Sequence, residues 1–380
     1  MLIVNFLKKV KKTFSNSNYD ALIKVLISKS ALLDNLNEYK THYPQIGFAP
    51  VLKSNAYGHG LVEVAKILDK EEKPFFVVDS LFEARTLREN GIKSDILIIG
   101  YTTPENITRS KLPGVAFTLT SMSQLETLSK TEFRVIKIHL KIDTGMHRQG
   151  IASEEIEKII KIVKNNSNII LEGICSHLAD ADNLDDSFTQ KQIKEWNGAV
   201  KIFKENFDSL KYFHLSASSG AQYSKDIEAN VARLGIGLYG AIESNLKLKP
   251  ILEMQTILSS IKTIQKEEGV GYNLTYKTPK IMRLATVPVG YFEGVDRRLS
   301  NIGFFKIGNN FCPIVGRVSM NITSIDISSV PEAKEGDKVV VLSNNPEDKN
   351  SVMNIAKTAG TISYKILVHI PQHLKRIVVD

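Results

Sequence analysis

The sequence is poor in cysteine and in long apolar segments. Its 380 residues include two cysteines, Cys175 and Cys312, and both lie in short apolar runs. Two such cysteines do not form the disulfide framework of a small secreted protein, so they favour a reducing, cytoplasmic compartment. No apolar run reaches the roughly 20 residues that a membrane-spanning helix needs.

Several common ligand-binding motifs are missing as well. The chain has no phosphate-binding P-loop and no GxGxxG after a strand-like run, which disfavours nucleotide and dinucleotide sites of those types. Residues 177–182, HLADAD, offer one histidine and two aspartates, but no second histidine or cysteine stands at ligand spacing. The sequence therefore predicts no metal site.

Clusters of one charge are rare. The net charge of +8 comes from 49 basic against 41 acidic residues, and the lysines are dispersed, which disfavours a nucleic-acid partner. The exception is the segment 1–18, whose lysines follow its apolar residues and which has no small-residue cleavage site, so it is a poor signal peptide. We interpret it as a frayed or docked extension without firm membrane association.

From about residue 46, the chain alternates short β-rich runs with amphipathic runs. Apolar residues recur at helical spacing in 60–72, 80–90, 153–165 and 187–206. Eight such βα repeats predict a parallel (β/α)8 barrel rather than an open sheet. The expected strands are 46–52, 75–78, 95–99, 114–119, 134–142, 169–177, 211–217 and 231–238.

The rhythm changes after residue 246. Runs such as IMRLATVPVGY and GDKVVVLS read as strands, 308–310 reads as a hairpin turn, and only 351–358 looks helical. We expect the α/β barrel at 19–246 to be followed by a mainly antiparallel β domain at 247–380. An early β run at 22–28 fits either domain.

Polar residues stand at the ends of five expected barrel strands, where barrel enzymes place their functional groups. Each residue alone would be ascribed to a satisfied core or rim position. Together they supply an amine, two guanidiniums, an imidazole and a serine–glycine turn. That set fits a phosphorylated carbonyl cofactor held through a lysine imine, namely pyridoxal 5′-phosphate (PLP). The residues are Lys53, Lys141, Asp143, Arg148, His177, Ser218, Ser219, Gly220 and Arg233.

With these residues in place, the chain resembles the alanine racemases, PLP enzymes with a barrel and a β domain. The resemblance runs from about residue 20 to the end. It rests on motifs that occur in the family's order: KSNAYGHG, LKIDTGMHRQG, LEGICSHLADAD, VARLGIGLYG, GYNLTY, VPVGYFEGVDRRLS, VGRVSMN and TISY. Several such matches in order are far more specific than any one of them.

The resemblance implies a set of cofactor contacts. Lys53 would bind PLP covalently, and His177 would lie beside the ring and support Arg233, whose guanidinium would face the pyridine nitrogen. Because arginine keeps its proton, it favours simple reprotonation at Cα over transamination. The residues that would hold the phosphate are Tyr57, Ser218, Tyr364 and the backbone of Gly235 and Ile236.

The resemblance also implies how the substrate is handled. Racemisation needs a base on each face of Cα, and Lys53 and Tyr272 match the two bases. Arg148 and the backbone N–H of Met320 match groups that bind the substrate carboxylate. Tyr291 matches a tyrosine at the substrate entrance, and Lys141 matches a lysine that some members carbamylate. Since Tyr272 and Met320 belong to the β domain, the resemblance implies a head-to-tail homodimer with shared active sites.

The resemblance therefore implies an isomerase that interconverts L-alanine and D-alanine and supplies D-alanine for peptidoglycan. The alternatives are a racemase with a broader or shifted preference, such as serine, and a non-catalytic PLP-binding protein, which would resemble the barrel alone. Asn321 departs from the aspartate that usually follows the residue at 320 in this family. We expect that change to alter the pH optimum.

Overall fold

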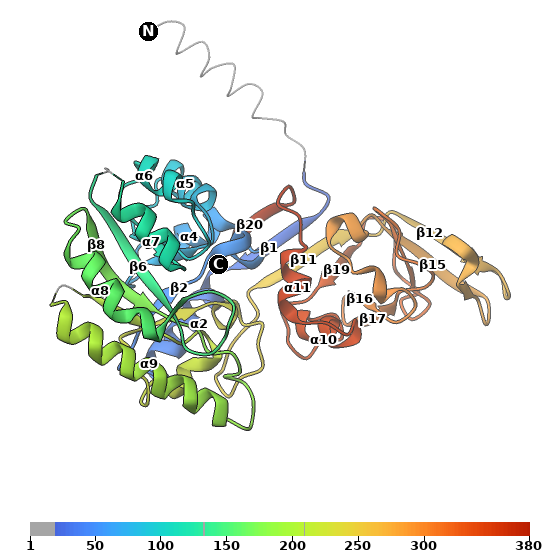
Figure 1. The fold of residues 1–380 in the computed structure, drawn as a ribbon. Helices are drawn as coiled ribbons and strands as arrows, with labels where there is room; N and C mark the ends of the chain where they lie inside the picture. The colour runs from blue at the N-terminus through green and yellow to red at the C-terminus, as the bar shows by residue number, and fades with distance from the viewer. Residues whose placement is uncertain (1–19, 132–133, 209) are drawn as a thin grey trace, which may run out of the picture.

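The computed structural model describes residues 20–131, 134–208 and 210–380, so the expected extension at 1–18 lies outside the described residues. Figure 1 shows a barrel built from the first part of the chain and a β-rich part beside it. Within the described ranges, no helix is both long and apolar enough to cross a bilayer.

The barrel is the parallel one that the sequence predicts. Six strands pair in the order β3-β4-β5-β6-β8-β9, while β2 pairs with β10, and a bridge from Val51 to Val77 joins the two groups. The N–H of Arg233 donates to the carbonyl of Ser216 at 3.0 Å, which closes the ring next to β9. The strands are β2 (Gly47–Pro50), β3 (Phe76–Val78), β4 (Ile96–Ile98), β5 (Val115–Leu119), β6 (Ile136–Asp143), β8 (Ile169–Cys175), β9 (Tyr212–His214) and β10 (Val231–Leu234); β7 (Ile151–Ala152) adds to β6.

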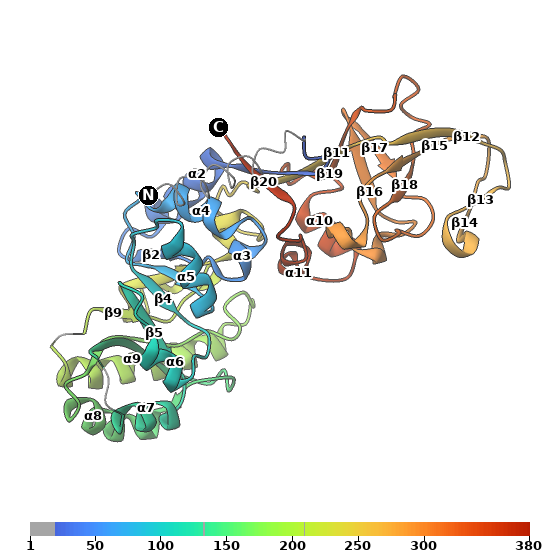
Figure 2. The same ribbon diagram turned by 90° about the horizontal axis from the view of Figure 1, so that it is seen from above.

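Helices follow the barrel strands and cover the outside of the ring (Figures 1 and 2). The expected helical runs correspond to α4 (Leu61–Leu68), α5 (Leu81–Glu89), α8 (Ile156–Lys164) and α9 (Ser187–Asn206). The sequence pattern missed α2 (Lys29–His42), α6 (Pro104–Arg109) and α7 (Met122–Ser129). Serine or threonine side chains cap these three: Ser28, Thr103 and Ser121 each accept a backbone N–H of the first turn.

The second part is mainly antiparallel, as expected. One sheet has the order β17-β16-β19-β11-β1-β20, a second β12-β15-β18 and a third β13-β14. Its strands are β11 (Leu252–Ile257), β12 (Ser260–Ile264), β13 (Gly269–Val270), β14 (Tyr276–Lys277), β15 (Met282–Val287), β16 (Phe304–Ile307), β17 (Asn310–Pro313), β18 (Thr323–Asp326), β19 (Lys338–Leu342) and β20 (Lys375–Val379). The hairpin expected at 308–310 joins β16 to β17.

In the second part, the structure decides one question that the sequence left open and adds one helix that was not expected. The run at 22–28 contains β1 (Lys24–Ser28), which pairs with β11 and β20 and so lies in the sheet of the second part. The expected helix at 351–358 is α10 (Val352–Thr358), but a second helix, α11 (Ser363–Val368), follows it. The expectation of one helix was wrong because α11 has only six residues, too few to show a periodic stripe.

Candidate functional site

Residues predicted for the barrel site lie at the carboxyl ends of its strands. Lys53 follows β2, Lys141 lies near the end of β6, and His177 comes two residues after β8. The other two strands contribute Ser218, beyond β9, and Arg233, within β10. Tyr364 comes from the second part, on α11, and its ring centroid is 5.8 Å from that of Tyr57.

Lys53 begins an unusual turn. It opens α3 (Lys53–Tyr57), in which Ser54, Asn55 and Ala56 have φ between 51 and 56° and lie in the left-handed region. Such a conformation costs a residue other than glycine about 1–2 kcal/mol, so the surroundings must hold it. Buried Glu83 does so in part, because its Oε1 accepts the N–H of Asn55 at 3.3 Å and its Oε2 accepts that of Asp79 at 2.8 Å.

Arg233 is a buried cation that has no carboxylate beside it among the described residues. The four hydrogens of Nη1 and Nη2 face five acceptors within hydrogen-bonding distance, and among the described residues all five are carbonyl oxygens or imidazole nitrogens. Nη1 contacts Nδ1 of His214 at 2.7 Å, and Nη2 contacts Nδ1 of His177 at 3.0 Å. These bonds fix the plane of the guanidinium.

His177 is held neutral. Burial lowers its pKa to about 3, and the nearby positive charges of Arg233, Lys141, Arg148 and Lys53 add to that effect. Because Nδ1 accepts a hydrogen bond from Arg233, the ring proton of neutral His177 lies on Nε2. Four cationic side chains therefore act on one imidazole at this end of the barrel.

The turn at Ser218 forms a small polar cradle. Ser218 Oγ accepts the N–H groups of Gly235 and Gly237, each at 3.1 Å. A Cβ at Gly235 would lie 2.7 Å from the hydroxyl oxygen of Tyr57, so only glycine allows the tyrosine to approach. Ile236 begins the short 3-10 helix η3 (Ile236–Tyr239) immediately beyond. Backbone N–H groups and hydroxyls converge there, as phosphate groups require.

The arrangement suits an anionic, phosphorylated ligand. The cations around His177 complement negative charge, and the Ser218 hydroxyl, which accepts two backbone N–H groups, keeps its own proton to donate to a ligand. Among the described residues, no group of three or more His, Cys, Asp or Glu could hold a metal ion. The chemistry available at this end of the barrel is that of an amine, an imidazole and guanidiniums.

Three predicted residues lie elsewhere in the chain. Tyr272, Tyr291 and Met320 are all exposed on the second part, and Tyr272 has 68% of its surface accessible. Tyr272 begins η4 (Tyr272–Leu274), between β13 and β14, which Figure 2 shows at the end of the molecule away from the barrel. Within one chain, Tyr272 is therefore not brought to Lys53.

Sequence reasoning missed several polar residues behind the barrel site. His214 contacts Arg233 directly, and His139 and Glu172 continue inward from it. The available signal was a lone polar residue inside each of three apolar strand runs, IHL, LEG and FHL, which is an uncommon placement for a charged or titratable side chain.

Comparison with known proteins gives a consistent result. Family models for "Alanine racemase, N-terminal domain" and "Alanine racemase, C-terminal domain" match residues 27–243 and 251–378. An alanine racemase of Carboxydothermus hydrogenoformans is 37% identical over 358 residues, covering 91% of this chain and 96% of the relative. That of Lactobacillus acidophilus is 33% identical, covering 93% and 96%.

Solved structures agree with the sequence comparison. The alanine racemase of Clostridium difficile 630 has a TM-score of 0.88 and 31% identity, covering 95% of this chain and 97% of that one. The alanine racemase of Bacillus anthracis, solved with bound L-Ala-P, has a TM-score of 0.86 and 29% identity, covering 96% of each chain. The chain belongs to the alanine racemase family.

Proposed function

We propose that this protein is a PLP-dependent racemase that interconverts L-alanine and D-alanine. The observation that carries the proposal is the buried Arg233, whose guanidinium is held by imidazoles and carbonyls rather than by a carboxylate, at the cationic end of a family barrel. An arginine beside the cofactor's ring nitrogen leaves that nitrogen without an easily transferred proton. That environment favours return of the proton to Cα.

The barrel residues fit PLP. Lys53 would bind it covalently through Nζ, and the Ser218 cradle would hold its phosphate with Tyr57, Tyr364 and the backbone of Gly235 and Ile236. Neutral His177 would pack beside the ring and keep its hydrogen bond to Arg233. When bound, PLP supplies an electron-withdrawing ring that makes the Cα–H of an attached amino acid acidic.

Two bases would then move the proton. Lys53 Nζ would serve one face of Cα and the Tyr272 hydroxyl the other, so that removal on one face and delivery on the opposite face invert the centre. Arg148 and the N–H of Met320 would orient the substrate carboxylate, and Tyr291 would line the entrance. A fixed carboxylate keeps Cα between the two bases.

A homodimer would complete the site. Tyr272, Tyr291 and Met320 are exposed in one chain, and Tyr272 lies at the end of the second part away from the barrel, so a partner chain arranged head to tail could supply them. The exposed neighbours Leu274 and Phe292 add apolar surface of the kind that interfaces cover. We place the enzyme in the cytoplasm, in keeping with its two free, buried cysteines.

Lys141 would carry a carbamate that orients Arg148. Burial lowers the pKa of Lys141, and the nearby Arg233 and Arg148 lower it further. A lower pKa leaves more of the neutral amine, which is the form that adds CO2 and releases a proton. Labelled bicarbonate should therefore give a carbamate signal that is absent from Lys141→Arg.

The test of the function is proton exchange. The protein with PLP and L-alanine in D2O should lose the Cα–H signal while D-alanine appears in a chiral assay. Tyr272→Phe should slow both while PLP remains bound. Binding of PLP through Lys53 without exchange on alanine would contradict the proposal, and serine in a parallel tube would identify a racemase of shifted preference.

A further inference from the structure

A chain of polar groups leads from Arg233 through the inside of the barrel, away from Lys53. Nη1 of Arg233 lies 2.7 Å from Nδ1 of His214, and Nε2 of His214 lies 2.7 Å from Nδ1 of His139. Nε2 of His139 lies 3.9 Å from Oε2 of Glu172, and Oε1 of Glu172 lies 2.7 Å from Nζ of Lys137. All except Lys137 are buried. The chain thus connects the two ends of the barrel.

Strand periodicity explains how the chain is built. Every second residue of a strand points to the same face, so Lys137, His139 and Lys141 lie on one face of β6. Lys141 is near the carboxyl end, where the proposed site lies, and Lys137 is near the amino end. Glu172 on β8 and His214 on β9 come from neighbouring strands of the same sheet. One face of β6 therefore carries Lys141 in the proposed site and Lys137 at the opposite end of the barrel.

The proton positions along the chain follow from Arg233. Arginine only donates, so Nδ1 of His214 must accept. Burial and the Arg233 charge lower the pKa of His214 well below its usual value, so the ring is neutral and carries its proton on Nε2. This Nε2–H group donates a hydrogen bond to Nδ1 of His139. Burial also lowers the pKa of His139, and because Nδ1 of the neutral ring accepts this hydrogen bond, its single proton lies on Nε2, facing Glu172.

The far end of the chain is a carboxylate. Burial raises the pKa of Glu172, but its contacts with His139 and Lys137 outweigh burial and bring the value to about 2. At 3.9 Å, the contact between His139 Nε2 and Glu172 is too long for a hydrogen bond and is electrostatic. Two neutral imidazoles with aligned dipoles therefore lie between a guanidinium and a carboxylate.

We propose that His139 and Glu172 are positioning residues that act through His214 on Arg233 and hold its guanidinium toward the cofactor's ring nitrogen. The inference rests on the proposed function, which places Arg233 at that nitrogen. The Glu172 charge polarises His139 electrostatically, and the hydrogen bonds from His139 through His214 to Arg233 polarise one another, so the charge strengthens the bond at Arg233 although the two residues do not touch. Arg233 thus gains a counter-charge at a distance through Nη1, while Nη2 contacts His177 and two carbonyl oxygens.

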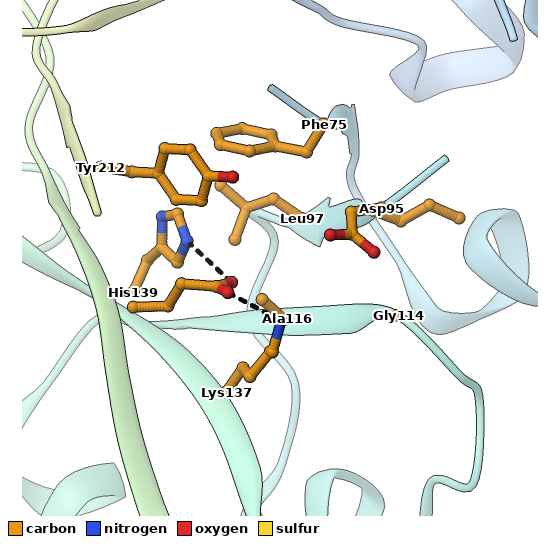
Figure 3. Close-up of a pocket in the computed structure, with 10 residues that line it drawn as sticks. Phe75, Asp95, Leu97, Gly114, Ala116, Lys137, His139 and Tyr212 are labelled. Atoms are coloured by element: carbon orange, nitrogen blue, oxygen red, sulfur yellow. Dashed lines mark ion pairs between the residues drawn. The ribbon is translucent and has the colours of Figure 1, made fainter. Parts of the chain in front are cut away.

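The packing around the two histidines supports this role. The Phe75 ring meets both imidazoles edge to face, with centroids 5.5 Å from His139 and 5.7 Å from His214. The Tyr212 ring stacks on His139 at 5.7 Å. Figure 3 shows the Tyr212 and Phe75 rings on one side of His139 and the ion pairs that it and Lys137 make with the carboxylate. A Cβ at Gly173 would lie 2.7 Å from Nδ1 of His139, so only glycine leaves room for this ring.

The first test reads the proton positions directly. In protein with 15N-labelled histidine, His139 and His214 should both be neutral, with the proton on Nε2, and each signal can be assigned from its own His→Gln variant. The spectra are taken with and without PLP and need no turnover. A doubly protonated ring, or a proton on Nδ1 of either residue, would overturn the proposal.

The second test removes the distant charge. Glu172→Gln keeps the shape of the side chain, and we expect kcat to fall about 10- to 100-fold while KM for L-alanine stays within about twofold. The absorption band of the bound cofactor should shift as well, because the ring nitrogen meets a differently held guanidinium. The matched control is Asp348→Asn, which removes a buried carboxylate that pairs with Lys306 at 2.6 Å in the second part.

The outcomes separate this inference from the proposed function. If Glu172→Gln changes the absorption band and kcat no more than Asp348→Asn does, the positioning role is wrong although the racemase assignment stands. If the unaltered protein does not racemise alanine, the histidine spectra still decide the proton positions. If Glu172→Gln does not fold, the same spectra of the unaltered protein decide the proposal.

Discussion

Nδ2 of Asn321 donates a 2.6 Å hydrogen bond to Oε1 of Glu293. The other carboxylate oxygen, Oε2, accepts the N–H of Gly290 at 2.8 Å, and Glu293 is buried. An amide at position 321 is thus a donor to a carboxylate that already serves the turn before Tyr291. The departure from the family's aspartate at this position has a local physical reason, since two facing carboxylates would repel each other.

Asn321→Asp should destabilise the protein by about 1–3 kcal/mol at pH 7, because it removes a donor and adds a like charge. The repulsion raises the folded-state pKa of the new carboxyl pair. The lost stability should therefore appear as pH rises through that pKa and should be smaller near pH 4. Urea midpoints of both proteins at pH 4 and pH 7 measure the difference.

The double variant Asn321→Asp with Glu293→Gln is the control. It exchanges donor and acceptor, because the glutamine amide can donate to the new carboxylate at position 321 while its oxygen still accepts from Gly290. Most of the lost stability should return. Equal instability of the single and double variants would show that the hydrogen bond is not the cause.

Gly173→Ala should destabilise the barrel by about 1–3 kcal/mol, because its Cβ would press on the His139 ring and the ring is enclosed. The control is Gly198→Ala in α9, where a Cβ meets nothing within 4 Å. That change should be neutral or stabilising, since alanine favours helix by about 1 kcal/mol over glycine. Thermal midpoints of the two variants should move in opposite directions or differ clearly.

Acid should destabilise the protein well before its carboxylates titrate. Burial lowers the pKa of His59 to about 4 and that of His177 to about 3, and it also lowers the pKa values of His139 and His214. In this pH range these histidines are protonated in the unfolded chain and neutral in the folded chain. The free energy of unfolding therefore falls as pH drops below about 6.5. Each histidine adds about 1.4 kcal/mol per pH unit to the slope.

Urea midpoints between pH 7 and pH 5, at one protein concentration, test this dependence. His59→Gln should reduce the slope by about one proton, because His59 is buried and makes no part of the proposed site. The exposed His373 provides the control, and His373→Gln should leave the slope unchanged. Midpoints that do not move over this range would contradict the neutral state of the buried histidines.

Mixing two inactive variants should restore activity if the sites are shared between subunits. Lys53→Ala and Tyr272→Phe damage different parts of the chain, so a mixed dimer has one site with both defects and one intact site. Random exchange should return about a quarter of the unaltered activity, because half of the dimers are mixed and each has one good site. Activity no higher than that of the two separate variants would show that each site is made by one chain.

Much of the barrel could be predicted from local pattern. Each of the eight expected strand runs overlaps a barrel strand, and the order of the strands follows the chain. Apolar runs and amphipathic stripes are properties of consecutive residues, so a sequence displays them directly. The short helix α11 and the left-handed turn at Ser54 to Tyr57 escaped prediction, because contacts from elsewhere in the chain hold them.

The sequence by itself determined the family, the barrel and the motifs that contain Lys53 and Tyr272, because motifs and strand or helix patterns are formed by consecutive residues. Only the tertiary structure decided which polar residues meet. His139 and His214 are separated by 75 positions and touch at 2.7 Å, and β1 joins a sheet with strands that follow residue 250. Such contacts form when the barrel closes. The spacing of the residues along the chain does not reveal them, because connecting helices separate in sequence the strands that lie side by side.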